Sequence, residues 1–324
     1  MFSLAELEAA KKQVYGVQPP TPQYQWPLLS AVVGTELWVK HENHTATGAF
    51  KIRGGITFMH WLRSNHPNVK GIVTATRGNH GQSQARAAKA LGLSATIVVP
   101  HGNSSEKNQA MQAFGATVVV HGNDFDAARL RAKHIAETQG LFLVPPFHAE
   151  IVKGVASYAL ELFDSVDAID TVYVPIGCGS GICGLIAARD ALGLDTQIVG
   201  VVSTAANAAK RSFESGVITE TGSANTFADG MAVRAPIAES FAMYRAGAAR
   251  IVEVSDDEVA NAIRAYFRCT HNVAEGAGAA ALAAAIQEKE QLSGKRVAVI
   301  LCGGNIDTSV FAEVLSGITP KVTV

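Results

Sequence analysis

Charge is scarce in this chain of 324 residues, and neither sign dominates. Charged residues make up 17% of the sequence, and the formal net charge is −1 at pH 7. Such a balance lacks the positive footprint that nucleic acid or an anionic membrane surface requires. Long apolar runs are missing too, since a run such as residues 297–301 has the length of a strand and is far too short to cross a bilayer. We therefore expect neither nucleic acid nor a membrane as a partner.

Cysteine is rare and is not spaced for metal binding. Cys178, Cys183, Cys269 and Cys302 form no Cys-x-x-Cys pair, and no histidines follow them at zinc-ligand intervals. We expect reduced thiols, as in a cytoplasmic protein. The first residues have the pattern of an amphipathic helix and lack that of a secretory signal. A cytoplasmic location is the resulting expectation.

What the chain does have is a regular alternation of short apolar runs and helical stretches. The apolar runs are rich in β-branched residues and do not alternate with polar ones, which is typical of strands covered on both faces. They lie at residues 71–75, 95–100, 117–120, 171–174, 197–202, 250–254 and 296–301. The intervening helical stretches favour parallel pairing. The sequence thus predicts an α/β fold of two domains, divided near Pro145 and Pro146, each with a mainly parallel sheet covered by helices, and an active site in the cleft between them.

Lys51 lies in an almost uncharged stretch, residues 47–55, where Arg53 is the other charged residue. A lysine amine is a nucleophile only when deprotonated, a form that burial beside another cation favours, and it can then form a Schiff base with a carbonyl. A lone lysine is more often a surface side chain whose stem packs on the protein. Three loops elsewhere in the chain favour the catalytic interpretation.

The first loop directly follows a predicted strand, the end of a parallel strand where ligands bind. Its glycines permit close backbone approach, and the helix that follows offers free N–H groups to a carboxylate. Asn79 has an amide that could donate to an aromatic oxygen. An ordinary tight turn explains the glycines equally well. The loop consists of Thr76, Arg77, Gly78, Asn79 and His80.

The second loop opens a helix with closely spaced glycines, a pattern typical of an anion cradle of backbone amides. Its residues are Gly177, Cys178, Gly179, Ser180 and Gly181. Residues 179–184 also match G-x-G-x-x-G, but a dinucleotide site needs an acidic residue at the end of the next strand, where residues 201–204 have none. A simple phosphate therefore fits better than NAD, and a 2′-phosphorylated dinucleotide stays open.

The third loop, Cys302-Gly303-Gly304-Asn305, follows the last predicted strand. A thiol there can hydrogen-bond a heterocyclic nitrogen without supplying a charge, although such a sequence alone is more often a capping turn. A lysine able to form an imine, a phosphate cradle and a neutral partner for a ring nitrogen together describe pyridoxal 5′-phosphate, whose ring is an electron sink and whose phosphate is a handle.

With these motifs in order, the chain resembles the threonine/serine dehydratase family of fold type II pyridoxal-phosphate enzymes, from about Pro22 to Ser316. The family's Ser-Phe-Lys-x-Arg-Gly-Ala is matched at residues 49–55 and its Ser-x-Gly-Asn-His at 76–80. Its tetraglycine loop, its Glu-Pro-Ala-Gly-Ala and its Ser-Gly-Gly-Asn are matched at residues 177–180, 275–279 and 302–305.

The resemblance implies a role for each matched residue. Lys51 would carry the Schiff base, and the substrate carboxylate would bind the loop from Thr76 to His80. The residues implied around the cofactor are Phe50, Lys51, Asn79, Gly177, Cys178, Gly179, Ser180, Gly181, Glu275 and Cys302. It also implies a homodimer of a large cofactor-binding domain (residues 1–39 and 146–324) and a small domain (residues 40–145) that forms the lid of the cleft.

The chain departs from the family pattern at several positions. Cys302 replaces a serine near the ring nitrogen, and Gly276 replaces a proline. Arg77 stands where racemizing relatives have an acid/base serine, which argues against racemization. Its guanidinium could recognise a second carboxylate or pair with an acid outside the pocket. Residues 203–208 lack the acidic residues of metal-activated relatives, so we expect no metal site.

The expected activity is the elimination of water and ammonia from a β-hydroxy-α-amino acid such as threonine, serine or a 3-substituted serine, in amino-acid catabolism. Lys51 would remove the α-proton. Within the family, β-replacement as in cysteine synthesis and racemization are the alternatives. From other classes, a non-catalytic ligand-binding protein and an NADP-dependent oxidoreductase stay open. The sequence does not reveal which β-hydroxy amino acid is preferred.

Overall fold

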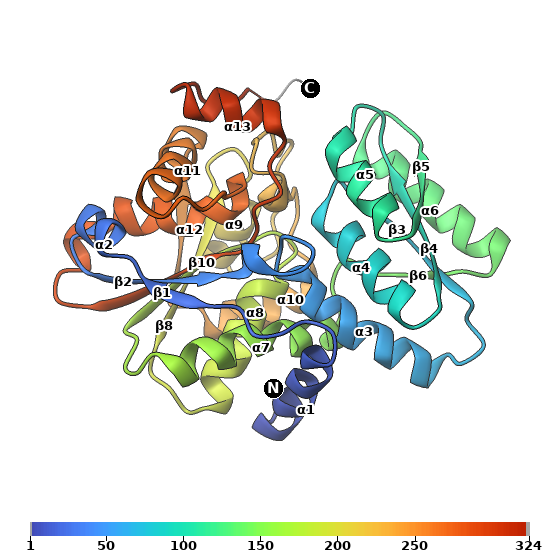
Figure 1. Ribbon diagram of the computed structural model, residues 1–324, viewed down its shortest axis with the longest axis horizontal. Helices are drawn as coiled ribbons and strands as arrows, with labels where there is room; N and C mark the ends of the chain where they lie inside the picture. The colour runs from blue at the N-terminus through green and yellow to red at the C-terminus, as the bar shows by residue number, and fades with distance from the viewer. Residues whose placement is uncertain (1, 322–324) are drawn as a thin grey trace.

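The computed structural model describes residues 2–321 and shows two sheets, one on each side of the molecule (Figure 1). One sheet has six strands in the order β1-β2-β10-β7-β8-β9, and the other has four in the order β5-β4-β3-β6. Every pairing is parallel except that of β1 with β2. The predicted α/β class with mainly parallel sheets is confirmed.

The strands of the six-stranded sheet are β1 (Gln23–Gln25), β2 (Glu36–His41), β7 (Thr171–Pro175), β8 (Gln197–Ser203), β9 (Arg250–Val254) and β10 (Arg296–Leu301). Those of the four-stranded sheet are β3 (Gly71–Ala75), β4 (Ser94–Val99), β5 (Ala116–Val120) and β6 (Phe142–Leu143). Helices α3 (Lys51–Asn65), α4 (Asn79–Ala90), α5 (Ser105–Ala113) and α6 (Phe125–Gln139) accompany the four-stranded sheet. The other helices are α1 (Leu4–Tyr15), α2 (Pro27–Val33), α7 (Ala149–Ser165), α8 (Ser180–Ala191), α9 (Ala208–Ser215), α10 (Ala238–Gly247), α11 (Asp256–Thr270), α12 (Gly276–Gln287) and α13 (Thr308–Leu315). Short 3₁₀ turns are η1 (Glu42–His44), η2 (Asp229–Met231) and η3 (Lys289–Gln291).

The central strands are buried along nearly their whole length, as their unbroken apolar runs predict. All residues of β7 and all but the first of β10 are buried. By contrast, the edge strand β5 has a single buried residue. Predicted strand bounds agree with the structure to within one residue. The short strands β1 and β6 and the more polar β2 were not predicted.

Strand β2 bears on the predicted domain boundary. Its last two residues, Lys40 and His41, pair with Ile300 and Leu301 of β10, so they belong to the six-stranded sheet. A boundary after residue 39 would cut this strand. The division into a large and a small domain stays a prediction, and we refer below to the six-stranded and four-stranded units.

Helix α3 is wedged between α7 and α4 because two glycines follow Arg53. A Cβ atom on Gly54 would lie 2.6 Å from Ile151 Cγ2 of α7, and one on Gly55 would lie 2.3 Å from Ser83 Oγ of α4. No real side chain fits at these distances. The glycines therefore bring the backbone of α3 against a helix of each unit, and Lys51 is the first residue of this wedge.

The helix ends follow the local sequence. Ser255 and Glu258 form a capping box at the start of α11, and Ser104 caps α5. Within residues 2–321, no helix has both the length and the apolar character needed to span a bilayer.

Candidate active site

Lys51 is held at the carboxyl end of β10. The Phe50 N–H donates to the Cys302 carbonyl over 3.0 Å, and Ala49 forms an antiparallel bridge with Gly303. The Lys51 amine lies 4.5 Å from the centroid of the Phe50 ring. The structure thus brings Lys51 beside Cys302, two residues from opposite ends of the sequence that the motifs had singled out separately.

The Cys302 thiol is suited to a neutral role. Its side chain is buried, and burial raises its pKa far above the ordinary value; Glu275 adds to this rise and Lys51 opposes it. The thiol therefore stays protonated at neutral pH. It can donate to a ring nitrogen without placing a negative charge beside it.

The loop at residues 76–80 presents the N-terminus of α4 to the same region. The Gly78 N–H donates to Thr76 Oγ1 over 3.1 Å and the Thr76 N–H to the Val98 carbonyl. The amides left for a carboxylate are those of the first turn of α4, beginning at Asn79 and His80. The structure therefore narrows the predicted carboxylate site to these N–H groups.

His80 faces Lys51 with a neutral ring. Burial, followed by the charge of Lys51, lowers the pKa of His80 to about 4. Its Nε2 atom is buried and has no hydrogen-bond partner within residues 2–321. A polar atom in this state indicates room for a ligand group at this position.

Asn79 is fixed by a chain of side-chain hydrogen bonds between the two units. Its Nδ2 donates to Glu275 Oε1 over 2.6 Å, and its Oδ1 accepts from Asn305 Nδ2 over 2.7 Å. Asn305 Nδ2 also donates to the Thr47 carbonyl. One hydrogen of the Asn79 amide stays available for a ligand oxygen, as the sequence interpretation requires.

The Glu275 carboxyl lies over Gly303, whose added Cβ would come within 2.5 Å of Oε1. Burial raises the pKa of Glu275 to about 7, although Lys107, Lys51 and the Asn79 hydrogen bond act in the opposite direction. Near neutral pH this carboxyl therefore exchanges a proton. Glu275 precedes α12 and makes no side-chain cap there, so its carboxyl is directed to the site.

The loop at residues 177–181 is shaped by close contacts at two glycines. Gly179 has a φ of 95° and precedes α8; its Cβ would lie 2.7 Å from Ser240 Cβ. A Cβ on Gly177 would lie 2.1 Å from the Gly230 carbonyl oxygen. Ser180 begins α8, whose first turn offers free N–H groups. This glycine cradle at a helix N-terminus suits a phosphate.

Cys178 lies in this cradle with a neutral thiol. Burial raises its pKa, and the charge of Lys51 acts in the opposite direction. The influence of Lys51 on Cys178, Cys302 and His80 places all three predicted loops around one amine.

Lys107 was missed by the sequence interpretation. Its amine pairs with Asp229 Oδ2 at 2.7 Å, linking α5 to η2 across the two units. Its stem lies over the carboxylate loop, where a Cβ on Gly78 would be 3.1 Å from Lys107 Cδ. A lysine in the first turn of a helix opposes the helix dipole. That mismatch is the signal that could have indicated a partner elsewhere in the chain.

The same turn of α5 makes two further bridges to the six-stranded unit. Ser104 Oγ donates to Asp307 Oδ1 over 2.6 Å, and Glu106 Oε1 accepts from the Thr308 N–H over 3.1 Å. With Lys107, these residues form a clasp, which we define as Ser104, Glu106 and Lys107 together with their partners.

Two predicted residues lie at the margins of the site. Arg77 is exposed, and within the described chain it forms no ion pair. Arg53 is not the free neighbouring cation that the sequence suggested. Its guanidinium is directed away from Lys51 and binds the Glu42 and Glu161 carboxylates.

The region of the expected missing metal site has one carboxylate beside it, that of Glu253, which accepts from Asn207 Nδ2 over 2.8 Å. Ser203 Oγ accepts from the Ala205 N–H over 3.2 Å. Across residues 2–321 there is no group of three or more histidine, cysteine, aspartate or glutamate side chains arranged to hold a metal ion. The absence of metal dependence stays a prediction.

Comparison with known proteins decides the family. Residues 14–303 match the family of pyridoxal-phosphate dependent enzymes. The chain is a member of this family. The enzyme is 32% identical to an L-threonine ammonia-lyase of Thermotoga maritima over 98% of its own length and 79% of that protein. It is also 32% identical to an L-threo-3-hydroxyaspartate ammonia-lyase of a Pseudomonas species, covering 98% of this chain and 99% of that one.

The solved structures agree. The processed form of threonine deaminase isoform 2 from Solanum lycopersicum superposes with a TM-score of 0.89 at 30% identity, over 97% of this enzyme and 94% of that chain. The enzyme therefore uses pyridoxal 5′-phosphate. The residues around Lys51 suit this cofactor, because the glycine cradle leaves room for the phosphate where any side chain would clash, and the neutral Cys302 thiol faces the same space.

Proposed function

We propose that this enzyme removes water and ammonia from a β-hydroxy-α-amino acid and forms a 2-oxo acid. The names of its relatives, threonine ammonia-lyase and threo-3-hydroxyaspartate ammonia-lyase, support this reaction class. The observation that carries the proposal is the attachment of the Lys51 turn to the end of β10, which puts a lysine amine, a neutral thiol and a phosphate cradle around one space.

In this proposal the chain holds the cofactor at four points. Lys51 would bind its aldehyde carbon, and Asn79 would donate its free amide hydrogen to the ring oxygen. Cys302 would donate to the ring nitrogen. The amides of residues 177–181 and the Ser180 hydroxyl would bind the phosphate. When bound, the cofactor supplies the electron sink that stabilises a carbanion at the substrate α-carbon.

The remaining groups handle the substrate. Its carboxylate binds the N–H groups of Asn79 and His80 at the positive end of α4. Once the substrate amine has displaced Lys51 from the cofactor, the freed Lys51 amine would take the α-proton, and the β-hydroxyl would take up a proton and leave as water. The enamine product then hydrolyses to the 2-oxo acid and ammonia. Neutral His80 leaves the carboxylate site free of an additional titrating charge.

Elimination is favoured over the two alternatives inside the family. Racemization needs an acid/base group on the face of the substrate opposite Lys51, and Arg77 is unsuited to it because a guanidinium does not deprotonate. β-Replacement stays as the second candidate from the motif resemblance. A homodimer, a cytoplasmic location, a catabolic role and independence from metal ions stay predictions.

The test is 2-oxo acid release from threonine, serine, 3-hydroxyaspartate and 3-phenylserine, with magnesium or with a chelator. We expect release from at least one substrate, unchanged by chelation and abolished in Lys51→Ala. Faster consumption of O-acetylserine with sulfide would favour β-replacement. A purified protein that stays colourless and inactive after cofactor addition would refute the proposal.

A further inference from the structure

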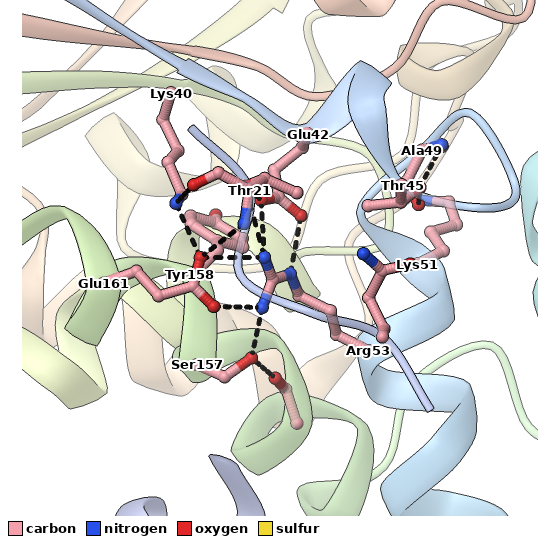
Figure 2. Close-up of polar contacts among 12 residues, drawn as sticks. Thr21, Lys40, Glu42, Thr45, Ala49, Lys51, Arg53, Ser157, Tyr158 and Glu161 are labelled. Carbon is pink, nitrogen blue, oxygen red and sulfur yellow. Dashed lines mark hydrogen bonds and ion pairs between the residues drawn. The ribbon is translucent and has the colours of Figure 1, made fainter. Parts of the chain in front are cut away.

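Arg53, two residues after Lys51, has all five of its guanidinium N–H groups bound. Glu42 accepts from Nε at 2.7 Å and from Nη2 at 3.0 Å, while Glu161 accepts from Nη1 at 2.6 Å and from Nη2 at 2.9 Å. The fifth N–H donates to Ser157 Oγ over 2.9 Å. The side chains of Arg53 and Glu42 are fully inaccessible, and that of Glu161 is 5% exposed. Figure 2 shows the guanidinium enclosed by these acceptors.

The surrounding groups complete an electrically balanced cluster. Lys40 donates to Glu161 Oε2 over 2.6 Å and to the Thr21 carbonyl over 2.7 Å. Thr21 Oγ1 donates to Glu42 Oε1 over 2.5 Å. Two cations thus face two carboxylates. Removing a single member would leave an unpaired buried charge, so the cluster holds its members in one arrangement.

This cluster lies on one side of the α3 wedge. The acceptors come from η1 and α7, and a Cβ on Gly154 of α7 would lie 2.4 Å from the Arg53 carbonyl oxygen. On the other side, Ser83 of α4 donates to the Lys51 carbonyl over 2.6 Å. Five bonds from Arg53 to η1 and α7 thus oppose one from Ser83. The first turn of α3 is held to α7, although α3 continues into the four-stranded unit.

We propose that Arg53 is a positioning residue, which keeps the Lys51 amine in register with Cys302 and the phosphate cradle by fastening the first turn of α3 to α7 and η1. The inference rests on the proposed role of Lys51. In Figure 2 the side chains of Lys51 and Arg53 extend from the same helical turn, and that of Arg53 enters the cluster. Only the planar fork of arginine binds two carboxylates in this bidentate way; a lysine amine has three donors that point from one atom.

The test compares Arg53→Lys with the matched control Arg250→Lys. Arg250 also pairs with a carboxylate, Glu288, but begins β9 at the edge of the sheet remote from the loops. A displacement of about 1 Å at a reacting group costs on the order of 10²-fold in rate. We expect Arg53→Lys to lower kcat by about 10²-fold while KM changes less than about threefold, and Arg250→Lys to match wild type.

Two further readouts separate positioning from simple loss of stability. In the loaded enzyme, the pH midpoint of the visible absorbance of the lysine-bound cofactor should shift in Arg53→Lys only. In the cofactor-free protein, amide hydrogen exchange should rise in a peptide spanning residues 50–56 and not in peptides from β3 or β4. The proposal would be overturned if folded, cofactor-loaded Arg53→Lys had the kcat of wild type and the same pH midpoint of the absorbance. This holds even if the melting temperature of the variant were lower.

A milder change covers the case in which Arg53→Lys does not fold. Ser157→Ala removes one of the acceptors of Arg53 and should lower kcat about fivefold, as expected for roughly 1 kcal/mol, with KM unchanged and faster exchange at residues 50–56. Unchanged kcat and exchange in that variant would overturn the inference. Failure of the proposed function would be seen separately, as wild-type protein that carries no cofactor on Lys51. In that case the hydrogen-exchange comparison would still test whether Arg53 holds the first turn of α3.

Discussion

The loops at residues 177–181 and 76–80 both lead into the first turn of a helix, but they are held by different means. The phosphate loop is fixed by close contacts that admit glycine alone, with the Gly230 carbonyl at Gly177 and with the Ser240 side chain at Gly179. The carboxylate loop is fixed by side chains, chiefly Glu275 of the other unit and Lys107 of its own unit, which pairs with Asp229 across the two units. The phosphate loop is therefore determined by the fold of one unit. The substrate side depends on how the two units are held together, and specificity can change there without altering the phosphate loop.

The largest effect is expected where the backbone defines the site. In Gly177→Ala the new Cβ would meet the Gly230 carbonyl oxygen at 2.1 Å. Overpacking of this kind costs roughly 1–3 kcal/mol, so the cofactor dissociation constant should rise about 5- to 150-fold. Equilibrium titration with cofactor measures this. The control is Gly222→Ala, whose Cβ meets nothing within 4 Å, and equal affinity in the two variants would break the comparison.

The next effect concerns the side-chain bridge at Glu275 and its dependence on pH. The folded-state pKa of about 7 lies above the ordinary value of 4.5. Between these values the folded protein holds a proton that the unfolded chain has lost, so this residue lowers stability as pH rises from about 4.5 to 7. The loss is roughly 3 kcal/mol at most.

Glu275→Gln removes this titration and keeps an oxygen that can accept from Asn79. We expect the free energy of unfolding of the variant, minus that of wild type, to increase as pH rises through this window. Above the window this difference should be constant. Denaturant unfolding at a series of pH values gives the difference. Buried His80 and His41 titrate in the opposite sense, but they are present in both proteins and cancel. A difference that does not vary with pH would contradict the assignment.

The smallest effect is expected at the clasp. Lys107 stays charged because Asp229 and Glu275 raise its pKa more than burial lowers it. Asp229 is half-exposed, so the pair contributes only about 0.5–1 kcal/mol. Lys107→Met should therefore raise KM two- to fivefold with little change in cofactor affinity. Lys133→Met, which removes an exposed lysine of α6, is the control. If Lys107→Met bound the cofactor more weakly but kept the KM of wild type, the clasp would act on the cofactor site and not on the substrate site. That result would contradict the comparison of the two loops.

The contrast between the loops also explains what sequence could predict. Residues 177–181 and 76–80 were located because short glycine patterns between a strand and a helix carry local information. Lys107 and Asp229 were missed because their contact joins distant segments. A partial signal existed in Glu161, a lone acid among the buried apolar residues of α7. The prediction that Arg53 is a free cation beside Lys51 was wrong, because nothing near Arg53 in the sequence identifies its carboxylate partners.

The central claim is that Lys51 carries the cofactor, and its most direct test is chemical. The loaded enzyme would be reduced with borohydride, digested and mapped by peptide mass. We predict that the phosphopyridoxyl label is found on the peptide containing Lys51 and is absent when Lys51→Ala is treated in the same way. A label on another lysine of the wild-type enzyme, with Lys51 unmodified, would contradict this account.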